Sequence, residues 1–331
     1  MKRIVWIYVA IVMSIFAVFL LSLQMGTMTI APLDVWRTFM GDGTDQHALV
    51  LFGFRLPRMV IALLVGAGLA VSGAILQSLS RNELADPGIL GINAGAGLAV
   101  VIFIYFFQGS YTSLGETVFA LPFFAFVGAL TAAFLIYTLA WKKGVTPIRL
   151  VLVGIGLNAG FTAILIVFQL RMNPNDFMQA TVWLNGDIWG TSWASTLAVL
   201  PWILLLIPLV MAQARTLNVM RLGDPSAISL GIKVERTRRR LLVWAVMLAG
   251  ASVSVGGAIS FLGLVAPHIA RRLVGPRHQV MIPTAAMMGA LILLFADMVG
   301  RNLLSPSEIP VGIVVAVIGA PYFLYLLMKT P

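Results

Sequence analysis

The sequence has no cysteine and few charged residues. Without cysteine, the chain can have no disulfide framework, no thiol nucleophile and no cysteine-ligated metal. Charged residues make up 10% of the 331 residues, whereas ordinary soluble domains carry roughly 25%. Apolar residues make up 60% of the chain. This composition indicates an all-α polytopic membrane protein.

Sequence signatures of catalysis are also missing. The chain has no Gly-x-x-x-x-Gly-Lys-Ser/Thr loop for ATP, no His-Glu-x-x-His zinc motif and no Gly-x-Ser-x-Gly elbow. We therefore expect no catalytic residue, no metal site and no cofactor bound by this chain, which is not an enzyme by itself. If the chain moves a solute uphill, a partner must deliver the energy.

Long apolar runs predict about ten transmembrane helices in a single domain over residues 1–331. A segment at 259–270 covers only about 18 Å of a hydrocarbon core roughly 30 Å thick, so we expect a short helix that is broken, tilted or extended by its flanks. The other runs lie at 4–24, 57–79, 88–107, 118–140, 148–170, 193–213, 241–258, 281–300 and 309–328.

The basic residues predict the orientation of the chain. Ten crossings with both termini in the cytoplasm place most of the 22 Lys and Arg residues on the inner side, as the positive-inside rule requires. Nine crossings place fewer of them inside. The net charge of +10 is thereby explained by the lipid bilayer as partner, without binding of nucleic acid.

A basic loop at about 214–240 is the most distinctive cytoplasmic segment. Within it, Asp224 at the cap position and Pro225 in the first turn are typical of a helix start, and Gly231 is typical of a helix end. The arginines from 236 to 240 have a simpler interpretation, attraction to anionic lipid worth about 1 kcal/mol each near the surface. We expect the segment from Asp224 to Gly231 to contact a partner, while these arginines mark the membrane boundary.

Ionisable groups are scarce within the predicted spans, where Asp297 is the one carboxylate. Arg301 follows four residues later on the same helical face, so a local ion pair is favoured over a proton relay. An ion-coupled secondary transporter stays open as the alternative of another class. His268, which follows Pro267, is interpreted as a hydrogen-bonded structural residue.

Two apolar segments are similar to each other. Residues 67–75, Ala-Gly-Leu-Ala-Val-Ser-Gly-Ala-Ile, resemble residues 249–259, Ala-Gly-Ala-Ser-Val-Ser-Val-Gly-Gly-Ala-Ile, with two residues inserted. In the ten-crossing topology they run in opposite directions. Inverted repeats of this kind recur in transporters.

Several motifs resemble the FecCD-type permeases in order and spacing over nearly the whole chain. These permeases are the membrane subunits of bacterial ATP-binding-cassette (ABC) importers for iron-siderophores, haem and vitamin B12. The matching motifs are Arg55-Leu56-Pro57-Arg58, Asn82-Glu83-Leu84-Ala85-Asp86-Pro87-Gly88, Gly263-Leu264-Val265-Ala266-Pro267-His268 and Glu308-Ile309-Pro310-Val311-Gly312.

The resemblance implies a multi-pass protein of the bacterial cytoplasmic membrane that works in a complex. The expected partners are a second permease subunit, identical or paralogous, two ATP-binding subunits that use ATP and Mg²⁺, and an extracytoplasmic binding protein. An iron-siderophore is the expected ligand, and haem and vitamin B12 stay open as alternatives within the family.

The resemblance also implies residue roles. Arg55, Arg58 and Arg301 would dock the binding protein through salt bridges, with anchoring to lipid headgroups as the alternative. Contact with the ATPases would fall to Asp224, Pro225, Ser226, Ala227, Leu230 and Gly231. The cytoplasmic gate would comprise Asn82, Leu84, Thr146, Pro147 and Ile148, and the pathway lining Gly154, Gly156, Asn158 and Gly312. Glu83 and Pro147 depart from the common pattern of the family.

Overall fold

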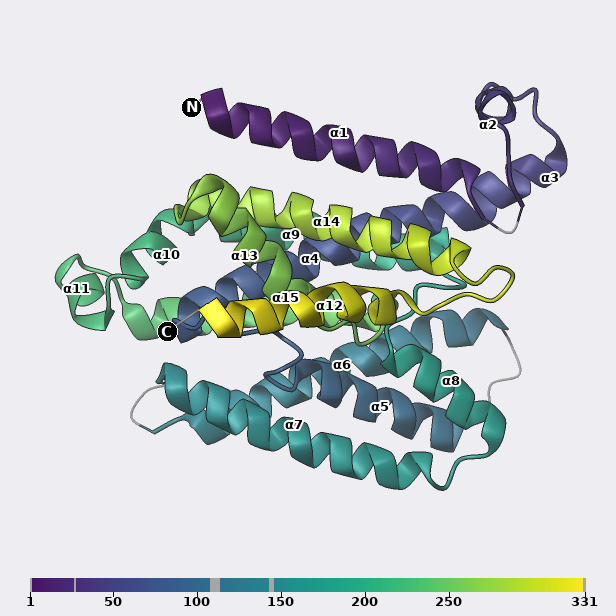
Figure 1. Ribbon diagram of the computed structural model, residues 1–331. Coiled ribbons are helices and arrows are strands. Elements are labelled where there is room, and N and C mark those ends of the chain that lie inside the picture. The colour runs from purple at the N-terminus through teal and green to yellow at the C-terminus, as the bar shows by residue number, and fades with distance from the viewer. Residues whose placement is uncertain (1, 27, 108–113, 143–145, 330–331) are drawn as a thin grey trace.

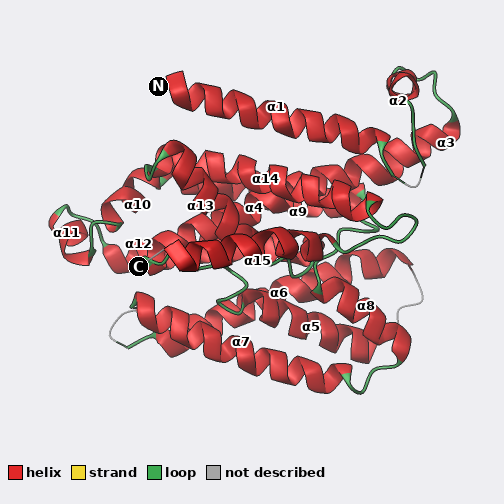
Figure 2. Ribbon diagram, in the orientation of Figure 1, coloured by secondary structure: helices red, strands yellow, loops and turns green. Residues whose placement is uncertain are grey.

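The computed structural model describes residues 2–26, 28–107, 114–142 and 146–329, and helices build its fold (Figure 2). Seven helical segments are long and apolar enough to cross a membrane, and α5 and α15 are shorter apolar helices. Together with α13 they make up the ten segments that the sequence predicts. The transmembrane set is α1 (Lys2–Gln24), α4 (Leu56–Ser80), α5 (Ile92–Phe107), α6 (Leu114–Ala140), α7 (Pro147–Gln169), α9 (Trp193–Ala212), α12 (Val234–Gly256), α13 (Leu262–Val274), α14 (His278–Asn302) and α15 (Val311–Lys329).

Short helices that the apolar pattern does not predict connect these spans. They are α2 (Pro32–Phe39), α3 (Asp45–Ala48), the π-helix η1 (Leu49–Arg55), α8 (Pro174–Leu184), α10 (Ala214–Met220) and α11 (Asp224–Ser229). The element α3–η1 runs directly into α4, so this span begins about a dozen residues earlier than predicted. Helix α12 likewise begins at Val234 instead of residue 241, which makes residues 236–240 helical.

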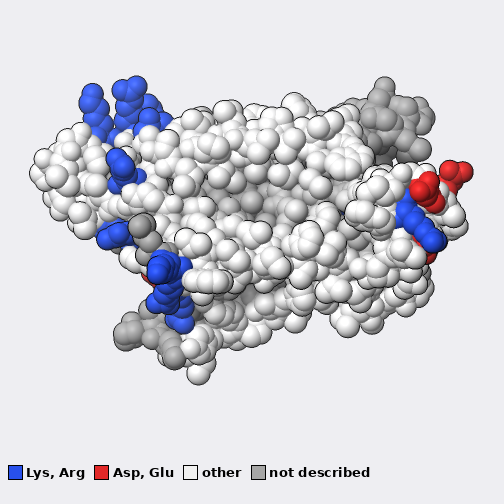
Figure 3. All heavy atoms as spheres, turned by 90° about the horizontal axis from the view of Figure 1, so that it is seen from above, with Lys and Arg blue, Asp and Glu red and all other residues white. Residues whose placement is uncertain are grey.

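The two ends of the bundle differ in charge. The start of α1, the end of α15 and helices α10 and α11 lie at one end, and α2, α3 and α8 lie at the other (Figure 1). Seen from above, Lys and Arg side chains gather at the α11 end, and the visible acidic side chains lie mostly at the opposite end (Figure 3). The positive-inside rule assigns the α11 end to the cytoplasm. The opposite end is called the outer end below.

Helix α4 passes through the centre of the bundle, and nearly all of its residues are buried. It packs against α14, α12, α13 and α9. Small residues allow these close approaches, since a Cβ atom added at Gly66 would overlap the carbonyl of Gly289 and one added at Gly73 would overlap that of Gly263. Glycine residues thus allow α4 to pack closely against α13 and α14.

Two non-helical segments meet inside the bundle. Residues 81–91 lead into α5, and residues 257–261 separate α12 from α13. Asn93 at the start of α5 donates a hydrogen bond to the carbonyl oxygen of Ile259 at 3.1 Å. The short predicted helix is thus broken from α12 and extends to Val274, beyond the expected end at residue 270.

The two similar segments of α4 and α12 lie against each other. The Ser72 hydroxyl donates to the carbonyl oxygen of Ala245 at 2.7 Å, and Gly68 faces the Ser252 side chain. Because residue 68 meets 252 and residue 72 meets 245, α4 and α12 run antiparallel, as the ten-crossing topology predicts for the two similar segments.

Candidate functional site

At the outer end, Arg58 of α4 binds two carboxylates. Its Nε donates to Oδ1 of Asp297 at 2.7 Å, and its Nη1 donates to Oε2 of Glu308 at 2.6 Å. Asp297 of α14 is fully buried, whereas the Glu308 side chain is 28% exposed. A buried carboxylate requires such partners, because an unpaired charge in an apolar environment costs several kcal/mol. The pair joins the outer ends of α4 and α14.

Two more arginines complete this cluster. Nε of Arg301 lies 3.2 Å from Oδ2 of Asp297, which confirms the ion pair predicted from their spacing. Arg301 also contacts Ser22 at the end of α1. Arg55 donates to the backbone carbonyl oxygens of Leu23 and Met28. The cluster therefore ties the outer end of α1 to the two central helices.

A cavity of about 360 Å³ opens between these side chains. Arg55, Arg58 and Arg301 all line it, together with Glu308 and Trp189. The structure thus brings the three predicted docking residues together, although only 5%, 7% and 5% of their respective surfaces are exposed. A docking partner would have to reach them through the cavity, and their docking role stays a prediction.

At the cytoplasmic end, the predicted coupling segment forms α11. Its end matches the expectation, because Gly231 has a φ of 81°. The N–H of Gly231 donates to the carbonyl oxygen of Ile228 at 2.9 Å, and the N–H of Ile232 donates to that of Ala227 at 3.0 Å. This is a Schellman cap, which satisfies the last carbonyls of the helix. The predicted start was wrong by one residue, because Gly223 occupies the cap position and Asp224 is the first helical residue.

Asp224 anchors α11 to its neighbours instead of capping the helix. Its carboxylate pairs with Arg81, just after α4, and with Arg238 of α12 at 2.9 Å. Burial acts to raise the pKa of Asp224, but the hydrogen bonds and charges of Arg238 and Arg81 outweigh it and lower that pKa below its ordinary value. The anchor is therefore charged at neutral pH.

Large apolar side chains are exposed on α11 and beside it. Leu222, Ile228 and Leu230 are 67%, 62% and 64% exposed, while Ala227 is buried and holds the helix against the protein. Pro225 and Ser226 are exposed beside them. Exposed leucine and isoleucine side chains on a cytoplasmic loop are typical of a protein contact. The coupling assignment stays a prediction, and the apolar set extends it to Leu222 and Ile228.

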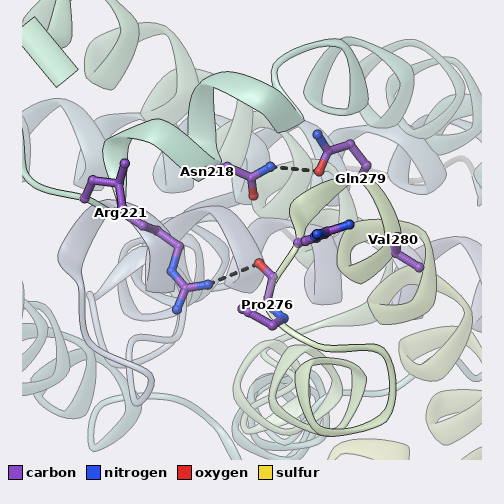
Figure 4. A pocket seen from close by; sticks show the side chains of 7 residues that line it. Asn218, Arg221, Pro276, Gln279 and Val280 are labelled. Atoms are coloured by element: carbon purple, nitrogen blue, oxygen red, sulfur yellow. Dashed lines mark hydrogen bonds between the residues drawn. The ribbon is translucent and has the colours of Figure 1, made fainter. Parts of the chain in front are cut away.

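A hollow of about 690 Å³ lies between α10 and the start of α14. Figure 4 shows Asn218 of α10 donating to Gln279, and Arg221 donating to the carbonyl oxygen of Pro276. Oδ1 of Asn218 also accepts from the backbone N–H of His278 at 3.0 Å, and the His278 ring lies 2.7 Å from the Ser78 hydroxyl of α4. This link could not be predicted from the sequence, because isolated Asn and His residues carry no spacing signal.

The predicted gate residues lie on two separate segments. Asn82 accepts from the N–H of Leu84 at 2.9 Å, and Leu84 packs against Leu264 and Val265. Glu83, which departs from the family pattern, forms an ion pair with Arg271 of α13. Nδ1 of His268 lies 3.5 Å from the Glu83 carboxylate, but neither ring nitrogen of His268 has a hydrogen-bond partner among the described residues, so the expected hydrogen bond of His268 was wrong. Helix α7 begins at Pro147, with Thr146 at its cap and Ile148 exposed. The gate assignment stays a prediction.

The predicted pathway residues fall into two groups. Gly154 and Gly312 pack closely against the backbones of Leu90 and Asn185, so within this chain they face neighbouring segments and no open lumen. Gly156 has open space around it, and Asn158 is half-buried against Gly91. Gly160, one turn further along α7, also faces open space. One face of α7 is therefore left uncovered.

Comparisons with known proteins give matches along nearly the whole chain. The family model described as "FecCD transport family" matches residues 14–329. The iron(3+)-hydroxamate import system permease protein FhuG of Bacillus subtilis is 60% identical over 316 residues, covering 95% of this chain and 94% of that protein. The hemin transport system permease protein HmuU of Yersinia pestis is 38% identical, covering 93% of this chain and 91% of that protein.

A solved structure agrees with the fold as well. It shows a metal-chelate type ABC transporter in an inward-facing conformation, with a TM-score of 0.83 and 28% identity, and the match covers 97% of this chain and 98% of that one. Family model, relatives and solved structure all match along nearly the full length, and on this evidence the chain belongs to the FecCD transport family.

Proposed function

We propose that this chain is the membrane permease subunit of an ATP-driven bacterial importer for ferric siderophores, with ferric hydroxamates as the first substrate class to test. The observation that carries the proposal is the 60% identity to an iron(3+)-hydroxamate permease along 95% of the chain. The hemin transport permease HmuU is less similar, at 38% identity.

The paired state of Asp297 supports ATP-driven over ion-coupled transport. A proton relay needs a carboxylate that can exchange its proton along a path. Asp297 is fully buried between Arg58 and Arg301, and each of its two carboxylate oxygens is paired with one of these arginines. The one carboxylate that lies within a predicted span is thus part of an ion-pair network between helices, and this favours a structural role over a proton relay.

The mechanism that fits this geometry begins at α11. Two ATP-binding subunits would contact the apolar face of Leu222, Ile228 and Leu230 and move α11 and α10 when they bind ATP. The link from Asn218 to His278 and Ser78 would pass that movement to α14 and α4. These helices carry the Arg58–Asp297 pair at their outer ends, where a binding protein would deliver the ligand.

The uncovered face of α7 supports a second permease subunit. Gly156 and Gly160 leave open space on a membrane-spanning helix, and Ile155 and Ile164 are exposed on the same helix. A second copy or a paralogue would pack against this face, and the pathway would run between the two subunits. Gly156 and Asn158 would then line it.

Uptake in a bacterium that lacks its own siderophore permeases tests the substrate class. The chain is expressed with its ATPase and binding protein, and cells receive iron as a ferric hydroxamate, iron as a ferric catecholate, or haem. The proposal predicts accumulation of the ferric hydroxamate in preference to the other two. Accumulation of haem alone would contradict the siderophore assignment.

A further inference from the structure

An exposed cationic stripe runs along the first turns of α12. Arg236, Arg239 and Arg240 are exposed, and Val243 and Trp244 follow them on the same side of the helix. These five residues line a hollow of about 280 Å³. Their spacing of three and four residues places them on one helical face. We call this set the α12 stripe.

The stripe differs from its neighbour Arg238, which points into the protein and pairs with Asp224 and Glu235. Within the described part of the chain, no hydrogen bond or ion pair joins Arg236 or Arg239 to another residue. Arg240 donates to Oε1 of Gln213 at 2.8 Å, and its guanidinium lies 5.4 Å from the centre of the Trp244 ring. Two cations are therefore available to a ligand.

An apolar groove continues from the stripe into the membrane region. It measures about 330 Å³, lies between α6 and α12, and shares Arg239 and Val243 with the stripe. The two helices pack together further along, where Gly250 approaches Phe126 and Ala129. The remaining lining residues are Leu130, Ala133, Phe134, Tyr137, Leu242 and Val246.

The position of the groove matches the inner boundary of the bilayer. Helix α12 starts directly after α11 at the basic end of the molecule (Figure 3). Tyr137 and Trp141 near the end of α6 lie with ring centres 5.6 Å apart, and Trp244 lies on α12. Aromatic side chains of this kind gather at the membrane–water interface. The Tyr137 hydroxyl oxygen is buried without a hydrogen-bond partner among the described residues.

We propose that the α12 stripe and this groove form a binding site for an anionic phospholipid of the inner leaflet. The lipid phosphate binds Arg236 and Arg239, and one acyl chain lies in the groove between α6 and α12. Charge selects the headgroup, because arginine forms forked hydrogen bonds with phosphate oxygens. The apolar groove distinguishes a lipid from a free phosphate, and it also favours lipid over an acidic surface of an ATPase, which has no acyl chain to place there. This inference is independent of the proposed function.

Native mass spectrometry of the full chain in detergent tests the proposal, with added phosphatidylglycerol, phosphatidylcholine or inorganic phosphate. The native chain is expected to retain phosphatidylglycerol in preference to phosphatidylcholine. Arg236→Gln with Arg239→Gln should weaken phosphatidylglycerol binding by about tenfold to thirtyfold, given roughly 1 kcal/mol per cation. The matched control, Arg3→Gln with Arg215→Gln, removes two exposed charges from the same end and should keep the preference.

A second variant tests the groove. Ala133→Trp fills it without changing charge and should weaken phosphatidylglycerol binding, while its melting temperature in lipid-free detergent shows whether it folds. If the Ala133→Trp variant does not fold, the Val246→Phe variant is used in its place to fill the groove. Equal binding of both lipids by the native chain, or an unchanged preference in the arginine double variant, would overturn the proposal. Loss of ATPase co-purification with an intact lipid preference would assign the stripe to the ATPase instead.

Discussion

Arg58 and Asp297 lie 239 positions apart in the chain, yet Nε of Arg58 donates a hydrogen bond to Oδ1 of Asp297 at 2.7 Å inside the bundle. The contact joins the outer ends of α4 and α14, the two helices whose cytoplasmic ends meet through Ser78 and His278. Polar contacts thus connect this helix pair at both ends. A movement imposed at one end is expected to reach the other as a shift of the whole pair, because packed helices move as units.

Replacing the shared carboxylate should destabilise the protein. Asp297→Asn leaves Arg58 and Arg301 buried without their common counter-charge, and breaking a buried ion pair in this way costs about 3–5 kcal/mol. The expected result is a clearly lower melting temperature in detergent. Asp42→Asn, which removes an exposed carboxylate at the same end, should leave the melting temperature unchanged. Equal stability of the two variants would show that the network is not structural.

Glu308 should compete with the binding protein for Arg58. Glu308 is partly exposed and already holds this arginine, so an acidic group of a docking partner must displace it. Glu308→Gln is therefore expected to strengthen binding-protein affinity about twofold to fivefold, in line with the modest energy of exposed ion pairs. Surface plasmon resonance at low and high salt measures this change. An unchanged or weaker affinity would argue against docking through Arg58.

The anchor of α11 should respond to acid. The pKa of Asp224 is lower in the folded chain than its unfolded value of about 3.9, so its stabilising contribution is present above that value and is lost as pH falls through the folded pKa. Because the chain has no cysteine, a spin label at Ser229→Cys reports on α11 alone. The label should be immobile from neutral pH down to about 5 and mobile in stronger acid.

Asp224→Asn supplies the control for that experiment. It removes the ion pairs with Arg81 and Arg238 at every pH, so the label should already be mobile at pH 7 and its mobility should lose the acid response. A label that stays immobile in this variant would show that the apolar contacts of Ala227 hold α11 without the ion pairs.

The open face of α7 makes a separate prediction. A Cβ atom added at Gly156 meets no atom within 4 Å among the described residues, so Gly156→Trp should leave the melting temperature of the isolated subunit unchanged. If α7 lines a pathway between two subunits, the indole ring should block uptake strongly. Gly156→Ala is the matched small variant and should transport normally. Normal uptake by Gly156→Trp would exclude this position from both the pathway and the subunit contact.

Composition and apolar runs were enough to predict the ten-segment fold and the short helix before α14. The spacing of four residues predicted the ion pair of Asp297 and Arg301, and the glycine at position 231 predicted the end of α11. Helix boundaries were less accurate where amphipathic turns extend an apolar run, as at the start of α12. There Arg238 lies within the helix and is buried with its charge paired to Asp224, and hydropathy alone does not record this pairing.

Contacts between distant residues could not be predicted. The partner of Arg58 lies 239 positions away, and nothing in either segment encodes their pairing. Glu308 was recognised only as part of a family motif, and the link from Asn218 to His278 and Ser78 gave no pattern. For Asp224, a local capping role was predicted because the sequence shows its neighbour Pro225, while its real partners Arg81 and Arg238 come from two other segments.

The most direct test of the account is ferric hydroxamate uptake by liposomes that contain this chain, its permease partner and its ATPases. The binding protein is added on the side of the membrane that the outer end of the permease faces. Uptake should require ATP, should persist when ionophores remove the proton and sodium gradients, and should be lost in Ile228→Ser with Leu230→Ser, because that change removes the exposed apolar face of α11. Leu303→Ser with Leu304→Ser, which changes exposed leucines at the outer end, should keep ATP-driven uptake. Uptake that continues without ATP and collapses with the ion gradient would contradict the account.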